Sequence, residues 1–289
     1  MKYGKWTMVV FGLLLLPLMS FAKPAAKGNT YFFERDDISL KVDVILPESY
    51  DSESSALYPA VYLLDGYWTR DLVTRMYVNL RFDNMLPELI FVSIGYPGEV
   101  ENIEQKRLTD LTPAYDSGFK AGGSASSLLD LISNSIVPMV GNNYRVDASR
   151  RVLTGHSLAG LFTLYAMYQK PNTFSHYAAI SPSALWANET LASIDTGYAK
   201  QNKNLKAQAY ITYGSDEYVP YVRALQRYTK QLEARDYDGL ELSLAKVEGM
   251  RHVGMQFEGF IRALAWAFAD RRPEGPSQFE KMNLKAQAE

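Results

Sequence analysis

The pattern of hydrophobic and polar positions changes along the chain and predicts two kinds of strand. Residues 38–46 alternate apolar and polar side chains with a period of two, which is typical of an antiparallel strand with one solvated face. Residues 59–64 and 89–95 are continuous apolar runs, as expected for central parallel strands covered on both faces. Further strands are predicted in the short run before Ser157 and in residues 176–181, 205–213 and 240–247, the last as an edge strand.

Segments with helical spacing lie between these strands. Residues 126–140 place apolar side chains at steps of three and four residues, and a glycine and two asparagines follow them. Helices are also predicted in residues 72–84, 158–169, 219–234 and 255–268. Strands and helices alternate about every 30 residues, which predicts an α/β fold with a mostly parallel central sheet and helices on both faces.

Three segments lack a clear period. Residues 96–123 mix prolines, glycines, charges and aromatic side chains, and they predict a long irregular loop of the kind that is often functional. Residues 23–30 predict a polar lead-in, and the proline-bearing tail from Arg271 predicts a frayed end. Because no repeat or linker interrupts the pattern, we predict a single domain over residues 23–289, with its core at about 35–270.

The first 22 residues resemble a secretory signal peptide. Lys2 and Lys5 precede an apolar core at 7–19, and small residues precede a cleavage point after Ala22. The alternative is an uncleaved anchor, but this core is shorter than the roughly 20 residues of a spanning helix. We therefore expect export to a bacterial periplasm, with no stable membrane insertion after cleavage.

Composition excludes several function classes. The formal net charge of −2 and the absence of a basic stripe argue against a nucleic-acid partner. The chain has no cysteine, which excludes disulfides, thiolate catalysis and cysteine-bound metals. We expect neither a metal nor an organic cofactor, and the sequence does not predict an oligomeric state.

The candidate chemistry centres on Ser157. The run Gly155-His156-Ser157-Leu158-Ala159 joins a predicted strand to a predicted helix, which is the context of a nucleophile elbow. The usual pattern is G-x-S-x-G, and here Ala159 takes the last position, with Gly160 one place later. The alternative is a serine that merely caps an ordinary helix.

A serine hydroxyl needs a general base, and the base needs an orienting carboxylate. Of the three histidines, His252 lies in a glycine-flanked loop after the last predicted strand, which makes it the candidate base. Serine hydrolases with this elbow place their acid between serine and histidine along the chain. Glu217 is our first choice for the acid, and the adjacent Asp216 is the second.

An oxyanion hole requires two backbone N–H groups aimed at the developing charge. The N–H of Leu158, directly after the nucleophile, is the first candidate. The second candidate is the N–H of Tyr67, with Gly66 as the alternative, in the turn after the strand at 59–64. The other interpretation of Asp65-Gly66 is an ordinary turn.

An ordered set of motifs carries a family resemblance over about residues 35–270. The set consists of Tyr62-Leu63-Leu64-Asp65-Gly66, Ile94-Gly95-Tyr96-Pro97, Arg107-Leu108-Thr109-Asp110-Leu111-Thr112-Pro113, Gly122-Gly123, Pro138, Tyr144-Arg145-Val146-Asp147, 155–162, Phe174, 180–186, 213–217 and His252. In these residues the chain resembles the putative-esterase group of α/β-hydrolases, which includes esterase D and, more closely, the ferric-siderophore trilactone esterases. The resemblance implies an α/β-hydrolase fold and hydrolysis of carboxylic esters by Ser157 and His252, with an acid that some siderophore esterases dispense with.

The resemblance also implies which residues border the substrate. The segments 107–113 and 183–186 would line the pocket, and Arg107, Trp68 and Trp186 are the candidate substrate contacts, with Arg70 and Arg75 as further cations. Arg107 could hold an anionic ligand, or it could instead tie down the long loop through an acid such as Asp110.

The sequence thus predicts an exported serine esterase that forms an acyl-enzyme on Ser157 and acts on siderophore-type lactones or small acyl esters. One alternative is an acyltransferase of the same fold, as in the related mycolyltransferases. The other is a ligand-binding homologue without turnover, for which Ala159 and the open choice of acid leave room.

Overall fold

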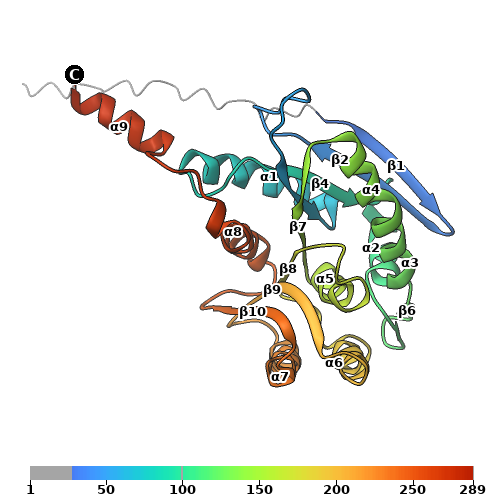
Figure 1. Ribbon diagram of the computed structural model, residues 1–289. Helices are drawn as coiled ribbons and strands as arrows, with labels where there is room; N and C mark the ends of the chain where they lie inside the picture. Colours follow the sequence, from blue (N-terminus) through green and yellow to red (C-terminus); the bar gives the residue numbers. More distant parts are fainter. Residues whose placement is uncertain (1–27, 99, 289) are drawn as a thin grey trace, which may run out of the picture.

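The computed structural model describes residues 28–98 and 100–288, and its centre is one eight-stranded sheet (Figure 1). The strand order is β1-β2-β4-β3-β7-β8-β9-β10. The strands are β1 (Thr30–Arg35), β2 (Ile38–Ile45), β3 (Tyr58–Leu63), β4 (Ile90–Gly95), β7 (Val146–His156), β8 (His176–Ile180), β9 (Asn204–Gly214) and β10 (Asp238–Val247). The β1–β2 and β2–β4 pairs are antiparallel and all other neighbours are parallel, so the predicted mostly parallel sheet is confirmed.

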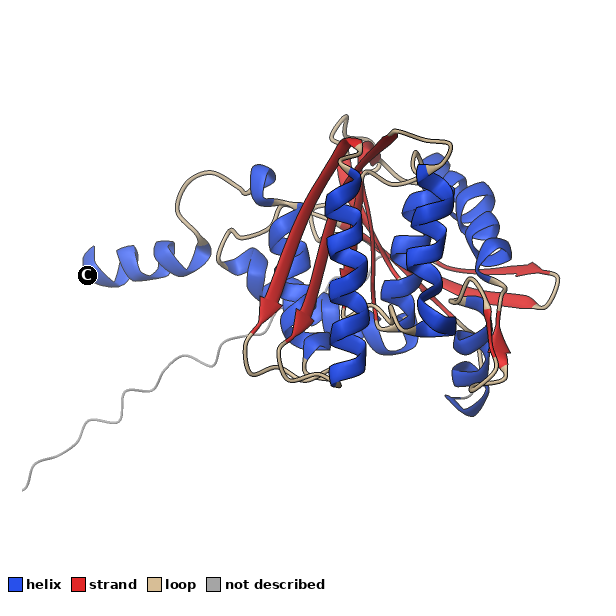
Figure 2. Cartoon of the chain, turned by 90° about the horizontal axis from the view of Figure 1, so that it is seen from below, coloured by secondary structure: helices blue, strands red, loops and turns tan. Residues whose placement is uncertain are grey.

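Helices cover both faces of this sheet (Figure 2). They are α1 (Gly66–Phe82), α2 (Val100–Asp110), α3 (Ala125–Leu131), a π-helical turn at Ile132–Ile136, α4 (Val137–Asn143), α5 (Leu158–Gln169), α6 (Trp186–Ala199), α7 (Val219–Arg235), α8 (Met255–Ala267), a 3-10 turn at Ala269–Arg271 and α9 (Gln278–Ala288). The helix predicted at 158–169 is found with those bounds, and the other predicted helices are found with shifted ends.

Alternation along the central strands divides the core into two layers. Successive side chains of a strand point to opposite faces. Tyr62 of β3 therefore packs in the cluster that contains α3, α5, α6 and α7, whereas Val61 and Leu63 pack in the cluster that contains α1 and α8. A continuous apolar run such as 59–64 is the sequence signature of this double burial.

Four segments differ from the predictions. Strand β1 begins at Thr30, at the end of the predicted lead-in, and pairs with β2. The predicted loop at 96–123 contains α2 and a small hairpin of β5 (Tyr115–Asp116) and β6 (Ala121–Gly122). Helix α6 begins at Trp186, where no helix was predicted, and the tail forms α9, which extends away from the sheet (Figures 1 and 2).

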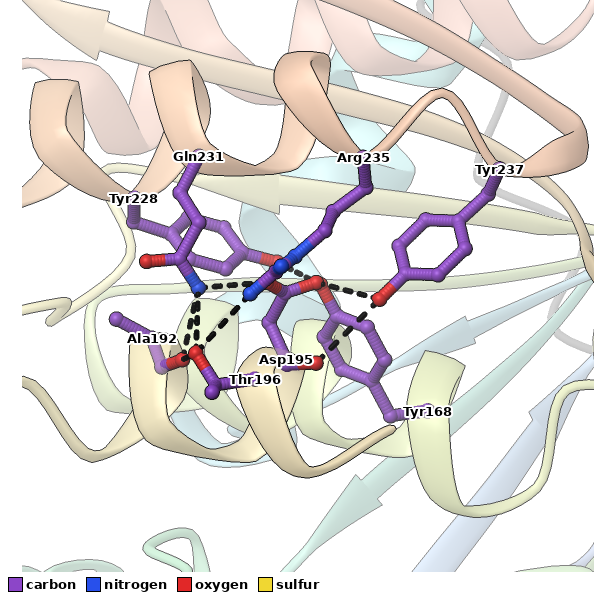
Figure 3. Close-up of polar contacts among 8 residues, drawn as sticks. All are labelled: Tyr168, Ala192, Asp195, Thr196, Tyr228, Gln231, Arg235 and Tyr237. Carbon is purple, nitrogen blue, oxygen red and sulfur yellow. Dashed lines mark hydrogen bonds and ion pairs between the residues drawn. The ribbon is translucent and has the colours of Figure 1, made fainter. Parts of the chain in front are cut away.

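Helices α5, α6 and α7 are tied together by a buried polar cluster around Asp195 (Figure 3). Asp195 is fully buried. One carboxylate oxygen accepts hydrogen bonds from Tyr168 at 3.2 Å and Tyr237 at 2.8 Å. The other accepts from Gln231 at 2.5 Å and from Arg235 Nε at 2.8 Å. The charge is therefore fully partnered, as a buried carboxylate requires.

No helix in the described ranges, 28–98 and 100–288, has both the length and the apolar character required to cross a bilayer. The predicted signal segment, residues 1–22, lies outside these ranges.

Candidate active site

Ser157 sits on a strained turn between β7 and α5. Its φ of 61° and ψ of −115° are unusual for a residue other than glycine. Small neighbours make this turn possible, because a Cβ at Gly160 would lie 2.9 Å from the Ile180 carbonyl oxygen. A Cβ at Gly155 would lie 2.5 Å from the Ala159 methyl group. The buried methyl of Ala159 thus fits the turn as long as residue 155 is glycine, which explains how the elbow accommodates Ala159.

The structure brings Ser157, His252 and Glu217 together. His252 Nε2 lies 2.9 Å from Ser157 Oγ, and His252 Nδ1 lies 2.6 Å from Glu217 Oε2. Ser157 follows β7, Glu217 follows β9, and His252 lies in the loop between β10 and α8. All three strands are parallel, so their carboxyl ends meet at one edge of the sheet.

Glu217, and not Asp216, is the acid that contacts the histidine. Its second oxygen accepts hydrogen bonds from Ser181 Oγ at 2.6 Å and from the Gly214 N–H at 2.7 Å. Burial by itself would raise the pKa of Glu217, but these donors and His252 outweigh it and hold that pKa below its usual value. Asp216 is exposed, accepts a hydrogen bond from Ser215 Oγ at 2.7 Å, and precedes the first turn of α7.

His156, next to the nucleophile, holds the loop that carries the candidate base. Its Nε2 lies 2.8 Å from the backbone oxygen of His252, and the two rings are 4.5 Å apart. Burial, and then the neighbouring His252, lower the pKa of His156 to about 3. His156 is therefore neutral at pH 7, and its Nε2–H donates to the His252 carbonyl while Nδ1 faces the amide of Gln256.

The two candidate oxyanion amides lie at helix N-termini on the same sheet edge. Leu158 is the first residue of α5, and Tyr67 is the second residue of α1. The first N–H groups of a helix have no intrahelical acceptor and are free to bind an anion. Leu63 pairs with Thr154, so Tyr67 follows β3 beside the point where Ser157 follows β7. Gly66 is needed here, because a Cβ would lie 2.4 Å from Ser93 Oγ.

Residues 37–219, more than half of the chain, match the sequence model of a family described as "Putative esterase". The chain belongs to this family. It is 32% identical over 163 residues to the siderophore triacetylfusarinine C esterase of Aspergillus fumigatus, which covers 54% of this chain and about half, 55%, of that protein. It is 24% identical over 240 residues to the ferri-bacillibactin esterase BesA of Bacillus subtilis, which covers 76% of this chain and 81% of BesA.

Solved structures show the same architecture. Siderophore hydrolase EstB from Aspergillus nidulans superposes with a TM-score of 0.74 at 21% identity, over 86% of this chain and 97% of EstB. The predicted family resemblance and the predicted α/β-hydrolase fold are therefore confirmed.

In this esterase-family chain, Arg107 forms an ion pair with Asp65. Its Nε and one terminal nitrogen each lie 2.7 Å from an oxygen of Asp65, and the other terminal nitrogen donates to Glu104 at 3.0 Å. Burial would lower the pKa of Arg107, but Asp65 raises it. These contacts favour the interpretation that Arg107 holds the 96–123 segment in place, with Asp65 as its partner instead of the expected Asp110. Asp110 is buried as well, and burial raises its pKa to about 6.

The two candidate tryptophans have different positions. Trp68 is partly exposed and lies under the Arg107 guanidinium, 4.8 Å from it. Trp186 is only 5% exposed, and its Nε1 donates to the Ala114 carbonyl at 2.8 Å. Phe119 of the β5–β6 hairpin stacks on Trp186 and is itself 56% exposed. Trp186 therefore supports the hairpin, and the exposed aromatic ring here belongs to Phe119; a role of Trp186 as a substrate contact stays a prediction.

Three contacts of the site were not predicted, although Ser183 belongs to the segment 183–186 that was expected to line the pocket. Ser183 Oγ lies 3.2 Å from Ser157 Oγ, Ser181 bonds the acid, and the Tyr221 ring stands edge-on at 6.2 Å from His252. The sequence Ser181-Pro182-Ser183 at the end of a strand was the available signal, because hydroxyl side chains there lie at the same edge as Ser157. Among the described residues, no three acidic or histidine side chains are arranged to hold a metal.

Proposed function

We propose that this chain is an exported serine esterase in which Ser157 is the nucleophile, His252 the general base and Glu217 the orienting acid. The observation that carries the proposal is the continuous hydrogen-bonded chain from Ser157 Oγ through both nitrogens of His252 to Glu217, at 2.9 and 2.6 Å. Such a chain is the arrangement that turns a weakly nucleophilic alcohol into an effective one.

The proposed reaction has two half-reactions. His252 Nε2 accepts the Ser157 proton while Oγ bonds to the ester carbonyl carbon, and the carbonyl π electrons move to its oxygen. The N–H groups of Leu158 and Tyr67, with Gly66 as the alternative to Tyr67, stabilise this oxyanion. It then collapses, the alcohol leaves with the proton from His252, and an acyl-enzyme remains. Water that gives its proton to His252 repeats the sequence and releases the acid.

Glu217 supports both steps because its carboxylate accepts the His252 Nδ1–H. It fixes the ring with Nε2 toward Ser157 and stabilises the imidazolium when it forms. The Ser181 hydroxyl and the Gly214 N–H hold the other carboxylate oxygen, which fixes the acid in turn.

Lactones of the siderophore type are the proposed substrates, with small acyl esters as simpler alternatives. The support is that the relatives above are named as esterases of triacetylfusarinine C and ferri-bacillibactin. Exposed aromatic side chains at the same edge, such as Phe119 and Tyr218, offer flat surfaces to an aromatic substrate. A periplasmic location follows from the proposed cleavage of residues 1–22.

The first test is Ser157→Ala. Hydrolysis of p-nitrophenyl butyrate and labelling by a fluorophosphonate are expected to disappear while the melting temperature stays nearly unchanged, because only one hydroxyl is removed. Ser55→Ala, at an exposed loop position, is the matched control and retains both activities. Turnover in Ser157→Ala would exclude Ser157 as the nucleophile.

The second test concerns substrate and acceptor. The purified protein is given a cyclic catecholate trilactone, linear acyl esters, and each of these with an added alcohol, and products are separated by chromatography. Faster opening of the trilactone supports the proposed substrate. Ester products of the added alcohol would indicate an acyltransferase instead.

A further inference from the structure

Ser183 is held against the nucleophile at two points. Its N–H donates to the Ser157 carbonyl oxygen at 3.0 Å, and its Oγ lies 3.2 Å from Ser157 Oγ. The residue lies in the loop between β8 and α6, directly after Pro182, and it is only 8% exposed. The loop therefore brings a second hydroxyl to the reacting oxygen.

The direction of this hydrogen bond follows from the other partners. Ser157 O–H donates to His252 Nε2, because Nδ1–H donates to the Glu217 carboxylate. The Ser157 oxygen is left with lone pairs only. In the described part of the chain, Ser157 Oγ is the one side-chain partner of Ser183 Oγ. Ser183 is therefore the donor and Ser157 the acceptor.

We propose that Ser183 is a further catalytic residue, whose hydroxyl stabilises the charge that develops on Ser157 Oγ. The proposal rests on the proposed function of Ser157 and His252. As the Ser157 proton moves to His252 Nε2, negative charge grows on Oγ while its lone pair forms the bond to the carbonyl carbon. The Ser183 hydrogen bond strengthens with that charge and Ser183 keeps its own proton throughout.

The same contact serves deacylation. In the acyl-enzyme Oγ is an ester oxygen, which accepts hydrogen bonds weakly, so the Ser183 contact relaxes. When water has added and the second tetrahedral intermediate collapses, the bond from carbon to Oγ breaks and its electron pair returns to Oγ. Ser183 again stabilises that oxygen until His252 returns the proton. Ser183 thus acts on both half-reactions, unlike a residue that only positions the substrate.

The test compares Ser183→Ala and Ser183→Thr with the wild type, and it measures ester kinetics and the rate of inactivation by a small fluorophosphonate. Loss of one hydrogen bond to a developing charge is expected to lower kcat/KM at least about tenfold. KM should change little. Inactivation should slow by a similar factor, because the small reagent needs no substrate-binding surface. Ser183→Thr, which keeps the hydroxyl, should recover most of both rates.

The outcomes separate this proposal from the proposed function. If Ser183→Ala reacts within about twofold of the wild type in both assays, the role of Ser183 is overturned while Ser157 stands. A change in KM alone would also overturn it, because it would indicate a substrate contact. If the wild type neither hydrolyses esters nor labels, the proposed function fails and the inference fails with it. Should Ser183→Ala not fold, Ser183→Cys, which has a similar shape and a weak donor, gives the same comparison.

Discussion

Glu217 and Asp216 are neighbours in the sequence and have opposite surroundings. Both acids lie in the turn after β9, and the backbone there directs the two side chains to different sides. Glu217 faces inward and meets three donors, whereas Asp216 remains in solvent. The difference is one of backbone direction, since the two side chains carry the same group.

Glu217→Gln is therefore expected to lower kcat strongly, by roughly 10² to 10⁴-fold, because a neutral amide neither fixes the His252 tautomer nor stabilises the imidazolium. Asp216→Asn, which makes the same chemical change one position earlier, should stay within about twofold of the wild type. Steady-state kinetics on one ester decide this. Equal losses in the two variants, or no loss in Glu217→Gln, would contradict the assignment of the acid.

The residues of the site could be predicted from the sequence where the chain offered few candidates of the required type. Three histidines and one elbow serine left few combinations, and His252 and Ser157 do lie in contact. Their catalytic roles stay predictions until the variants are measured. The contacts of Ser183 and His156 could not be foreseen, because they depend on the paths of two loops and no periodicity encodes such paths.

At the scale of elements, helices α6 and α7 are joined by two ion pairs in different surroundings. Asp195–Arg235 is formed by a fully buried carboxylate, whereas Arg227, which pairs with Glu189, is 57% exposed. Removal of one member of a buried, hydrogen-bonded pair leaves polar groups without partners, but solvent replaces a lost surface pair.

Asp195→Ala is expected to lower the free energy of unfolding by about 3–5 kcal/mol. The substitution removes the acceptor of the hydrogen bonds from Arg235 and from the hydroxyls of Tyr168 and Tyr237. Arg227→Gln, the control that breaks the surface pair, should cost less than about 1 kcal/mol. Urea unfolding of both variants provides the measurement. Similar losses would mean that the buried cluster (Figure 3) does not hold the helices together.

Elements with a strong apolar pattern were predictable, and elements held by other contacts were not. Among the side chains of helix α2 that the structure describes, Ile103 is the one fully buried apolar group, and the helix is also fixed by the Arg107–Asp65 pair, which no hydrophobic period reveals. Helix α9 begins with reciprocal bonds between Ser277 and Glu280. This capping box was readable in the sequence, but the prolines before it favoured a frayed tail.

At the scale of the whole molecule, part of the acid sensitivity arises far from the candidate site and adds to that of the buried His156 within it. His176 lies at the opposite end of β8, and it is buried beside Arg150, with Nε2 at 2.8 Å from the guanidinium. Burial, and then Arg150, lower the pKa of His176 to about 4. The unfolded chain therefore binds this proton more readily than the folded protein, and His176 makes folding less favourable as the pH falls from about 6.5 toward 4.

His176→Gln removes this titration. From pH 7 to pH 5 the stability of the wild type should fall relative to the variant by on the order of 2 kcal/mol. Asp110, whose pKa is raised to about 6, acts in the opposite direction but equally in both proteins, so it cancels in the difference. Urea unfolding of both proteins at the two pH values tests this. A difference that does not change with pH would show that His176 titrates normally.

The division of the chain into a signal segment and one domain stays a prediction, as does export. The fold itself followed from the double burial of β3 and β4, which only a sheet with helices on both faces provides. The antiparallel edge at β1 was harder to foresee, because β1 is short and largely exposed.

The hydrogen bond from the His156 side chain to the carbonyl oxygen of His252 links the residue next to one reacting group to the backbone of the other. Displacement of the elbow would therefore carry the imidazole along with it, and the spacing between proton donor and acceptor would be preserved. A scaffold coupled in this way should tolerate redesign of the outer surface of the 249–254 loop, since alignment depends on a main-chain anchor more than on the identity of the side chains around it.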